Sequence, residues 1–188
     1  PFGLRVDATK NSGFYEVEVD SKIVNDHSDR YIVLTERGDT VTENVLMAAA
    51  MNPGKTTIVG ASPNSMVQDV CFFLEKLGVK IEGIGTTRLK VHGKARFNMD
   101  VEYNISEDPI EAMTLIAAGI LTNSELTIKR LPIDYMEIEF AILRTMGLEY
   151  TKTAPYLSYN KKTNLVDITI KKSELVALKD KLTTFPSA

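Results

Sequence analysis

The sequence contains few of the residues that form disulfides or bind metal ions. Its 188 residues include one cysteine, Cys71, which excludes an internal disulfide and is compatible with a reducing cytosol. The two histidines, His27 and His92, lie far apart in the chain, and no cluster of carboxylates accompanies either. A metal site needs several converging ligands, so we expect none here.

The chain also lacks an excess of one charge and a long apolar segment. It has 22 basic and 25 acidic residues, a net charge of −3, and no basic patch that would favour nucleic acid. It has neither a run of about 18 apolar residues, which a membrane helix requires, nor a recognisable N-terminal signal. We therefore expect a soluble, cytoplasmic protein without nucleic-acid or membrane partners.

Glycine-rich nucleotide motifs are incomplete. Gly54-Lys55-Thr56 resembles the end of a phosphate loop, but Ala49 stands where that loop requires a glycine. The expected order is also reversed, because a helix precedes the motif and a strand follows it, so we interpret it as a helix-ending turn. The glycines of residues 83–85 lack the third glycine and the following helix of a dinucleotide site, which favours a hairpin. No cofactor is expected.

Cys71 is expected to be buried rather than reactive. It lies at helical spacing among Val67, Val70, Leu74 and Leu77, which together predict the apolar side of a helix on a sheet. A catalytic thiolate needs an electropositive and partly exposed setting, which this position does not offer.

One pattern occurs twice in the chain, about 70 residues apart. Asp39 aligns with Asp108, Ile58 with Ile128 and Gly78 with Gly147. The first copy covers residues 39–50, 55–59 and 66–79, and the second covers residues 108–119, 125–129 and 135–148. A repeat of this length indicates one supersecondary unit used more than once, in which each copy needs a neighbour to cover its apolar face.

Both copies contain sequences typical of helix starts and ends. The sequences of residues 40–43 and 65–68 match the capping-box motif. Residues 108–111 and 134–137 have an aspartate at the predicted N-cap and a glutamate three residues later. Helix ends are predicted at residues 52–54, 78, 122–123 and 147. The third helix, residues 110–121, is apolar almost all round, so it should be more buried than the amphipathic second helix.

Short alternating or apolar runs between the helices predict strands. They lie at residues 14–19, 31–34, 56–59, 80–85, 88–91, 101–105, 125–129, 148–152 and 165–170. The resulting fold class is α/β (α+β), with repeated βαβαββ units and the helices on one face of each sheet. We expect residues 1–105 and 106–188 to be two partial domains. Residues 1–6, read as a helix end followed by a strand, and residues 183–188, read as a cut loop, suggest an internal fragment.

The corner between the first strand and the first helix of the repeat is the candidate binding site. It contains Glu36, Arg37, Gly38, Asp39 and Thr40. A helix start presents free amides and the positive end of its dipole, which favour an anion, and an arginine adds a charge-assisted bond to a diphosphate. The alternative is that the polar side chains of this corner cap the helix and leave no site.

The corresponding corner of the second copy, residues 106–109, is acidic. It is therefore less suited to phosphate and more suited to capping or to a hinge.

The longest runs of both copies resemble a known family. Residues 42–50, 55–58, 67–93 and 108–118 closely resemble the UDP-N-acetylglucosamine 1-carboxyvinyltransferase family of enolpyruvyl transferases. The resemblance covers nearly the whole chain and is best over residues 31–150. It implies six βαβαββ units in an inside-out α/β barrel, three in each of two domains, with the substrate cleft between the domains.

The resemblance also implies a reaction. Members transfer an enolpyruvyl group from phosphoenolpyruvate to the 3-hydroxyl of UDP-N-acetylglucosamine, in peptidoglycan precursor synthesis for the cell wall. The loop that matches residues 36–40 helps to hold the UDP group, although a lysine is usual where Glu36 and Arg37 stand here. The family's interdomain hinge falls near residues 106–109.

No catalytic residue is assigned to this chain. In the family, the loop with a cysteine general acid precedes the part that matches residue 1, and the aspartate base follows the part that matches residue 188. Cys71 does not match that cysteine. We therefore expect the isolated chain to be inactive.

Two other functions stay open, a non-catalytic binding or regulatory module of the same fold, and a relative of the RNA 3′-phosphate cyclases. The net charge of −3 argues against the RNA function. We also expect the chain to self-associate, because helix 110–121 cannot be fully covered by one neighbour.

Overall fold

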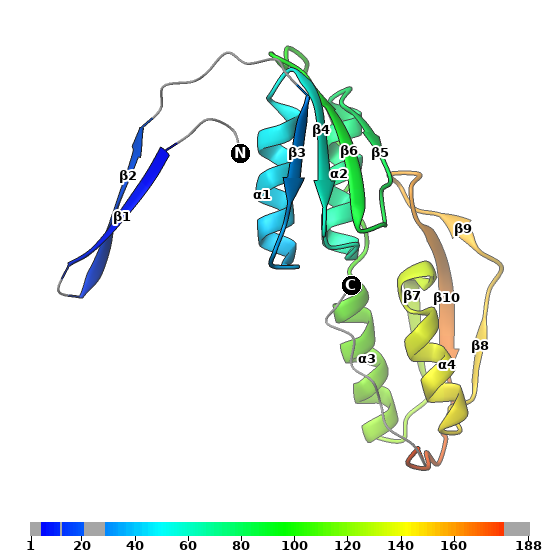
Figure 1. Ribbon diagram of the computed structural model, residues 1–188. Helices are drawn as coiled ribbons and strands as arrows, with labels where there is room; N and C mark the ends of the chain where they lie inside the picture. The colour runs from blue at the N-terminus through cyan, green and yellow to red at the C-terminus, as the bar shows by residue number, and fades with distance from the viewer. Residues whose placement is uncertain (1–4, 12, 21–28, 179–188) are drawn as a thin grey trace. The chain divides into compact units, whose positions relative to one another are not determined.

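The computed structural model describes residues 5–11, 13–20 and 29–178. The chain divides into two compact units, Pro1–Asp100 and Val101–Ala188, and each is described by itself (Figure 1). The placement of a domain boundary after residue 105, with the two parts in different domains of an enzyme, stays a prediction. The expected helix end before Arg5, His27 and the loop at 183–188 lie outside the described residues.

The first unit begins with a hairpin of β1 (Arg5–Asn11) and β2 (Phe14–Asp20), which pair antiparallel. The alternation in residues 14–19 predicted β2 correctly. The Lys10 ammonium lies 5.7 Å from the centroid of the Tyr15 ring, a cation–π contact between the two strands.

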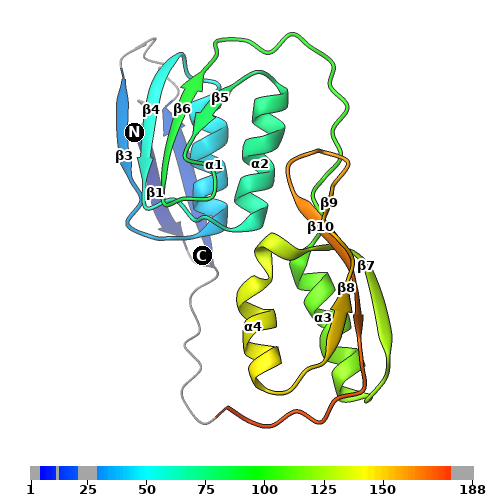
Figure 2. The same cartoon turned by 90° about the vertical axis from the view of Figure 1, so that its right-hand side faces the viewer.

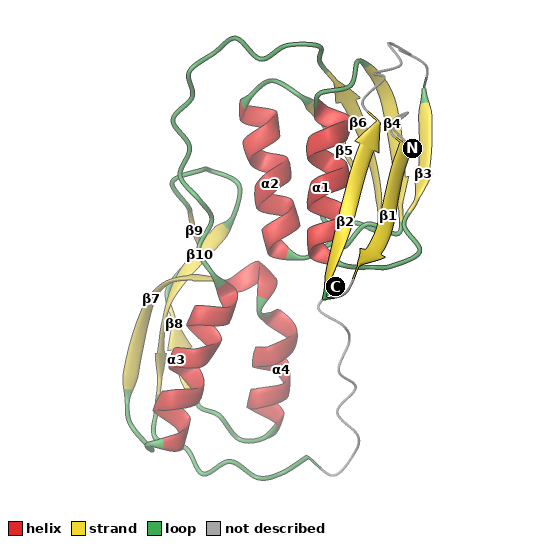
Figure 3. Ribbon diagram, turned by 90° about the vertical axis from the view of Figure 1, so that its left-hand side faces the viewer, coloured by secondary structure: helices red, strands yellow, loops and turns green. Residues whose placement is uncertain are grey.

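The main part of this unit has the expected βαβαββ order. A four-stranded sheet runs in the order β3-β4-β6-β5, with β3 and β4 parallel and the other neighbours antiparallel. The elements are β3 (Arg30–Val33), α1 (Asp39–Ala50), β4 (Gly54–Val59), α2 (Ser65–Lys76), β5 (Lys80–Glu82) and β6 (Arg88–Gly93). Both helices cover one face of the sheet (Figures 2 and 3).

The core lies between these helices and the sheet, as the apolar stripe of α2 predicts. Cys71 is 1% exposed and Leu74 5% exposed, while Val70 is only partly buried and packs against the same core. Ile58 and Val91 contribute from the sheet and are fully buried. Strand β5 is shorter than the predicted 80–85 because the hairpin turn begins at Gly83, whose φ of 84° does not fit a strand.

Three of the four predicted helix caps are wrong in detail. Helix α1 has Gly38 as its N-cap and no side-chain cap bond, so the capping box at residues 40–43 does not form. The cap of α2 is Asn64, whose side chain accepts from the Met66 amide, one residue before the predicted Ser65. Asp134 does not cap the fourth helix, because a turn of 3₁₀ helix intervenes and its carboxylate accepts from Asn164 instead, at 2.8 Å.

The second unit also has a four-stranded sheet, but in its described part no strand precedes the first helix. Its sheet runs β7-β10-β8, with β9 also paired to β10, and all of these pairs are antiparallel. The elements are α3 (Pro109–Leu121), β7 (Leu126–Pro132), a 3₁₀ turn (Ile133–Tyr135), α4 (Glu137–Thr145), β8 (Tyr150–Lys152), β9 (Tyr156–Leu157) and β10 (Asn164–Ile170). Ile116 and Phe140 are buried in its core, as expected.

The strand predicted at residues 101–105 does not form. These residues have no regular secondary structure, and Ile105 is 78% exposed. Alternation of apolar and polar residues is compatible with extended chain, but a strand also needs a hydrogen-bonded neighbour. The equivalent strand of the first unit, β3, finds that neighbour in β4, and the described part of the second unit offers no such pairing to this segment.

Helix α3 is less covered than its composition predicted. Ile116 is fully buried, yet Ile110, Leu115 and Leu121 are 62%, 45% and 86% exposed. An apolar helix that packs against one sheet leaves its opposite side uncovered within the unit. Within the described ranges, no helix is long and apolar enough to cross a lipid bilayer.

Candidate functional site

The candidate site lies at the carboxyl ends of the parallel strands β3 and β4. Residues 34–38 connect β3 to α1, and the N-cap Gly38 is extended, with φ −108° and ψ 148°. No side chain caps this helix, so the amides of its first turn keep their capacity to bind an anion. Arg37 and Thr40 are exposed beside this helix start.

Asp39 is turned away from the helix start. Its carboxylate accepts hydrogen bonds from the Ser62 hydroxyl at 2.5 Å and from the Asn64 side-chain amide at 3.0 Å. Both donors lie in the connection between β4 and α2 and are at least nine-tenths buried. The acid that could cap α1 therefore holds a neighbouring loop.

Thr42 of α1 also connects the β3–α1 loop to the β4–α2 connection. Its hydroxyl donates to the Gly38 carbonyl at 2.8 Å and accepts from the Ser62 amide at 3.0 Å, and the side chain is fully buried. The backbone around Gly38 is thus fixed by buried polar contacts rather than by a cap. A preorganised backbone of this kind is what an anion site requires.

The five predicted residues lie together on one loop and helix start, but they play different structural parts. Glu36 is exposed, and its carboxylate oxygen lies 3.9 Å from the place of a Cβ atom on Gly38. It therefore brings a negative charge to the edge of the site. The exposed Arg37 forms no ion pair with another described residue. Thr40 uses its carbonyl to accept from Asn44 at 2.8 Å.

Ser62 and Asn64 were missed by the sequence reasoning. They follow β4, and the carboxyl ends of two adjacent parallel strands meet at one edge of a sheet. That rule, applied to residues 31–34 and 56–59, could have placed residues 60–64 beside the predicted site.

The second corner is closed by its own side chains. Asp108 caps α3 and accepts from the Ile110 amide at 2.7 Å, as predicted. Glu107 forms an ion pair with Arg130, whose guanidinium lies 4.2 Å from the centroid of the Tyr159 ring. An added anion would meet the carboxylates of this corner first, so it is a poor phosphate site.

The remaining candidates of the sequence show no site. Burial raises the pKa of the Cys71 thiol to about 12, which leaves it protonated at neutral pH. His92 lies 3.2 Å from Glu82 in a partly buried cross-strand contact. Among the described residues, no group of three or more histidine, cysteine or acidic side chains could hold a metal ion.

The fold, helices on one face of a sheet in two successive units, is that of the enolpyruvyl transferases. The sequence model of the EPSP synthase (3-phosphoshikimate 1-carboxyvinyltransferase) family matches residues 1–185, and the chain belongs to this family. Two solved structures share the fold. They are the enolpyruvyl transferase NikO from Streptomyces tendae (TM-score 0.65, 21% identity, 90% of this chain and 39% of that one) and EPSP synthase from Acinetobacter baumannii (TM-score 0.66, 16% identity, 92% and 37%).

Two curated relatives carry the same name. A UDP-N-acetylglucosamine 1-carboxyvinyltransferase of Sulfurimonas denitrificans is 38% identical over 61% of this chain and 27% of its own length. A Campylobacter lari protein of the same name is 30% identical over 72% of this chain and 32% of its own length. The chain thus matches about a third or less of the length of these relatives.

Proposed function

We propose that this chain is part of an enzyme that transfers an enolpyruvyl group from phosphoenolpyruvate to the 3-hydroxyl of UDP-N-acetylglucosamine, in cytoplasmic peptidoglycan precursor synthesis. The family, and the shared name of the relatives, support the reaction class and the substrates. No catalytic residue, metal ion or cofactor of this reaction is assigned to the chain.

The observation that carries the proposal is the uncapped start of α1. The loop that corresponds to the family's UDP-binding loop ends at a glycine N-cap, with Asp39 turned to Ser62 and Asn64. In this proposal the amides after Gly38 bind a phosphate oxygen, and Arg37 adds a charge-assisted hydrogen bond. The hydroxyl of the exposed Thr40 is a further donor to the ligand in this proposal. Glu36 lies at the rim and restricts which anions approach.

Asp39 has a different role in this proposal. Its carboxylate does not touch the nucleotide, because both oxygens are engaged with the β4–α2 connection. It acts as a positioning residue that holds the backbone of the loop.

Titration calorimetry with UDP-N-acetylglucosamine tests the site. Arg37→Ala should raise the dissociation constant about tenfold, the effect expected for one lost hydrogen bond between charged groups. Arg96→Ala, at an exposed arginine of the same unit outside the loop, is the matched control and should change it less than about twofold. An unchanged dissociation constant for Arg37→Ala would remove this residue from the site.

The 188-residue chain by itself should give no turnover with both substrates, since no general acid or base is assigned to it. Product formation above a buffer blank would contradict this assignment.

A further inference from the structure

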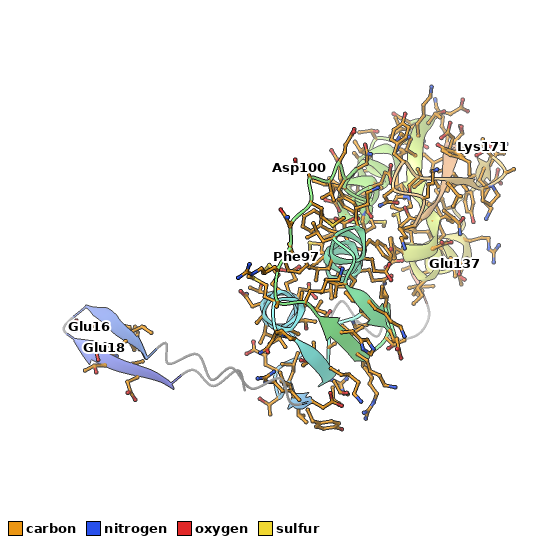
Figure 4. The ribbon with its side chains drawn as sticks, turned by 90° about the horizontal axis from the view of Figure 1, so that it is seen from above. Glu16, Glu18, Phe97, Asp100, Glu137 and Lys171 are labelled. Carbon is orange, nitrogen blue, oxygen red and sulfur yellow. The ribbon has the colours of Figure 1, made fainter. Side chains whose placement is uncertain are left out.

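A cavity opens on the second unit, whose residues are remote in sequence from the β3–α1 corner and belong to another sheet. It has a volume of about 520 Å³ and is lined by Arg144, Leu148, Glu149, Tyr150, Lys152 and Lys171. A smaller cavity of about 240 Å³ shares Arg144, Tyr150 and Lys152 with it and continues along α4 to Phe140 and Ile133. Figure 4 labels Lys171 from the larger cavity and Glu137 from the smaller one.

The larger cavity has an excess of positive charge. Arg144, Lys152 and Lys171 line it, and Glu149 is its one acidic lining residue. None of the three cations forms an ion pair with a residue in the described part of the chain. An anion bound at this opening would meet three cationic side chains and one carboxylate, which favours its binding.

Two of these cations and a tyrosine lie on regular secondary structure. Arg144 lies in the last turn of α4, where the negative end of the helix dipole favours a cation. Lys152 and Tyr150 lie on the edge strand β8, opposite Ile168 and Ile170 of β10. The Tyr150 ring packs against Phe140 with centroids 5.0 Å apart, which fixes its position between the two cavities.

We propose that this groove, formed by the two cavities, binds a small molecule that carries a phosphate monoester on an apolar or ring-containing group. A guanidinium fork matches two phosphate oxygens, while an ammonium adds a point charge and a tyrosine hydroxyl a further donor. Ala141 and the Tyr150 ring form the accessible part of an apolar wall next to these groups, since Phe140 and Ile133 of the smaller cavity are only 3% and 7% exposed. Glu149 lines the larger cavity and Glu137 the smaller one, and both carboxylates disfavour long polyanions.

The groove shares no residue with the proposed UDP-sugar site, because all its lining residues belong to the second unit. Binding of adenosine monophosphate, inorganic phosphate and adenosine to the 188-residue chain, followed by NMR, tests it. We expect chemical-shift changes at residues 144–152 with adenosine monophosphate, weaker binding of phosphate, and no binding of adenosine at these residues. Equal affinity for phosphate and the monophosphate would overturn the role of the apolar wall.

Substitutions identify the cationic groups. Arg144→Ala should raise the dissociation constant for adenosine monophosphate at least about tenfold, because a charge-assisted contact is lost. Lys172→Ala removes an equal charge next to Lys171 but outside the groove, and should change it less than about twofold. Arg37→Ala should leave it unchanged, which separates this site from the UDP-sugar site. Equal losses in Arg144→Ala and Lys172→Ala would mean unspecific charge attraction and overturn the proposal.

Discussion

Asp39 and Ser62 join the first turn of α1 to the connection between β4 and α2, through a hydrogen bond of 2.5 Å between residues 23 apart in the sequence. Ser62 is 3% exposed, so this bond is shielded from water. Because Asp39 is engaged here, it does not cap its own helix. One contact therefore holds two loops together at the carboxyl ends of β3 and β4 and leaves the helix amides available.

The first prediction concerns the strength of this contact. Ser62→Ala removes the donor to Asp39 and also the oxygen that accepts from the Asn64 amide at 3.3 Å. Leaving buried polar groups without partners should lower the free energy of unfolding by about 1–3 kcal/mol, measured by urea denaturation. Glu36→Ala, at an exposed acid of the same loop, is the control and should stay within about 0.5 kcal/mol of the native chain. Equal effects of the two variants would show that the buried contact contributes nothing.

The second prediction concerns acid stability through Asp167. The hydrogen bond from the Tyr156 hydroxyl, 2.6 Å long, and then the bond from the Arg130 amide lower the pKa of Asp167. A lowered pKa in the folded state means stability that is present above the unfolded-state pKa of about 3.9 and is lost as the pH falls through the folded-state pKa. Tyr156→Phe removes the largest cause, so the pKa of Asp167 should move up towards its usual range.

Carboxyl titration by NMR measures this shift. Tyr159→Phe is the matched control. It also removes one tyrosine hydroxyl, but it keeps the aromatic ring next to the Arg130 guanidinium and leaves the Tyr156–Asp167 hydrogen bond intact. If Tyr156→Phe leaves the titration of Asp167 unchanged, the hydrogen bond does not control its ionisation.

The third prediction concerns Cys71. Burial in the first core raises its pKa to about 12, and the side chain is 1% exposed. The thiol should therefore react with an aromatic disulfide reagent at pH 8 at least about a hundredfold more slowly in the folded chain than in denaturant. Similar rates in the two conditions would contradict the burial of Cys71.

The fourth prediction concerns self-association through α3. Leu115 and Leu121 are 45% and 86% exposed on an apolar helix, and exposed apolar surface of this kind favours contact with a second copy. We expect a concentration-dependent dimer in sedimentation at micromolar concentration. Leu115→Lys combined with Leu121→Lys should shift it to the monomer of 20.9 kDa.

Ile138→Lys is the control for this experiment. Ile138 is 65% exposed on α4, so its substitution adds a charge to another helix of the same unit. A single 20.9 kDa species of the unaltered chain at all concentrations would contradict the prediction, and so would equal dissociation by the control.

The sequence by itself determined the features that depend on neighbours along the chain. Asp108 caps α3 because its acceptor reaches an amide two residues away, and the stripe with Cys71 and Leu74 is buried because its spacing matches a helix turn. The repeat predicted the order of the elements for the same reason, since each copy encodes its own helix starts, turns and apolar faces.

Only the tertiary structure decided which partner each polar or extended segment takes. Asp39, the first residue of α1, makes no cap hydrogen bond and instead accepts one from Ser62, which the fold brings beside it from the β4–α2 connection. Residues 101–105 alternate like a strand, but a strand also needs a neighbouring strand to pair with, and in the described part of the unit this segment belongs to no sheet. Arg130 has a φ of 60° at a bulge opposite β10, held by the carboxylate of Asp167. Such choices depend on contacts between residues far apart in the chain, which local spacing does not encode.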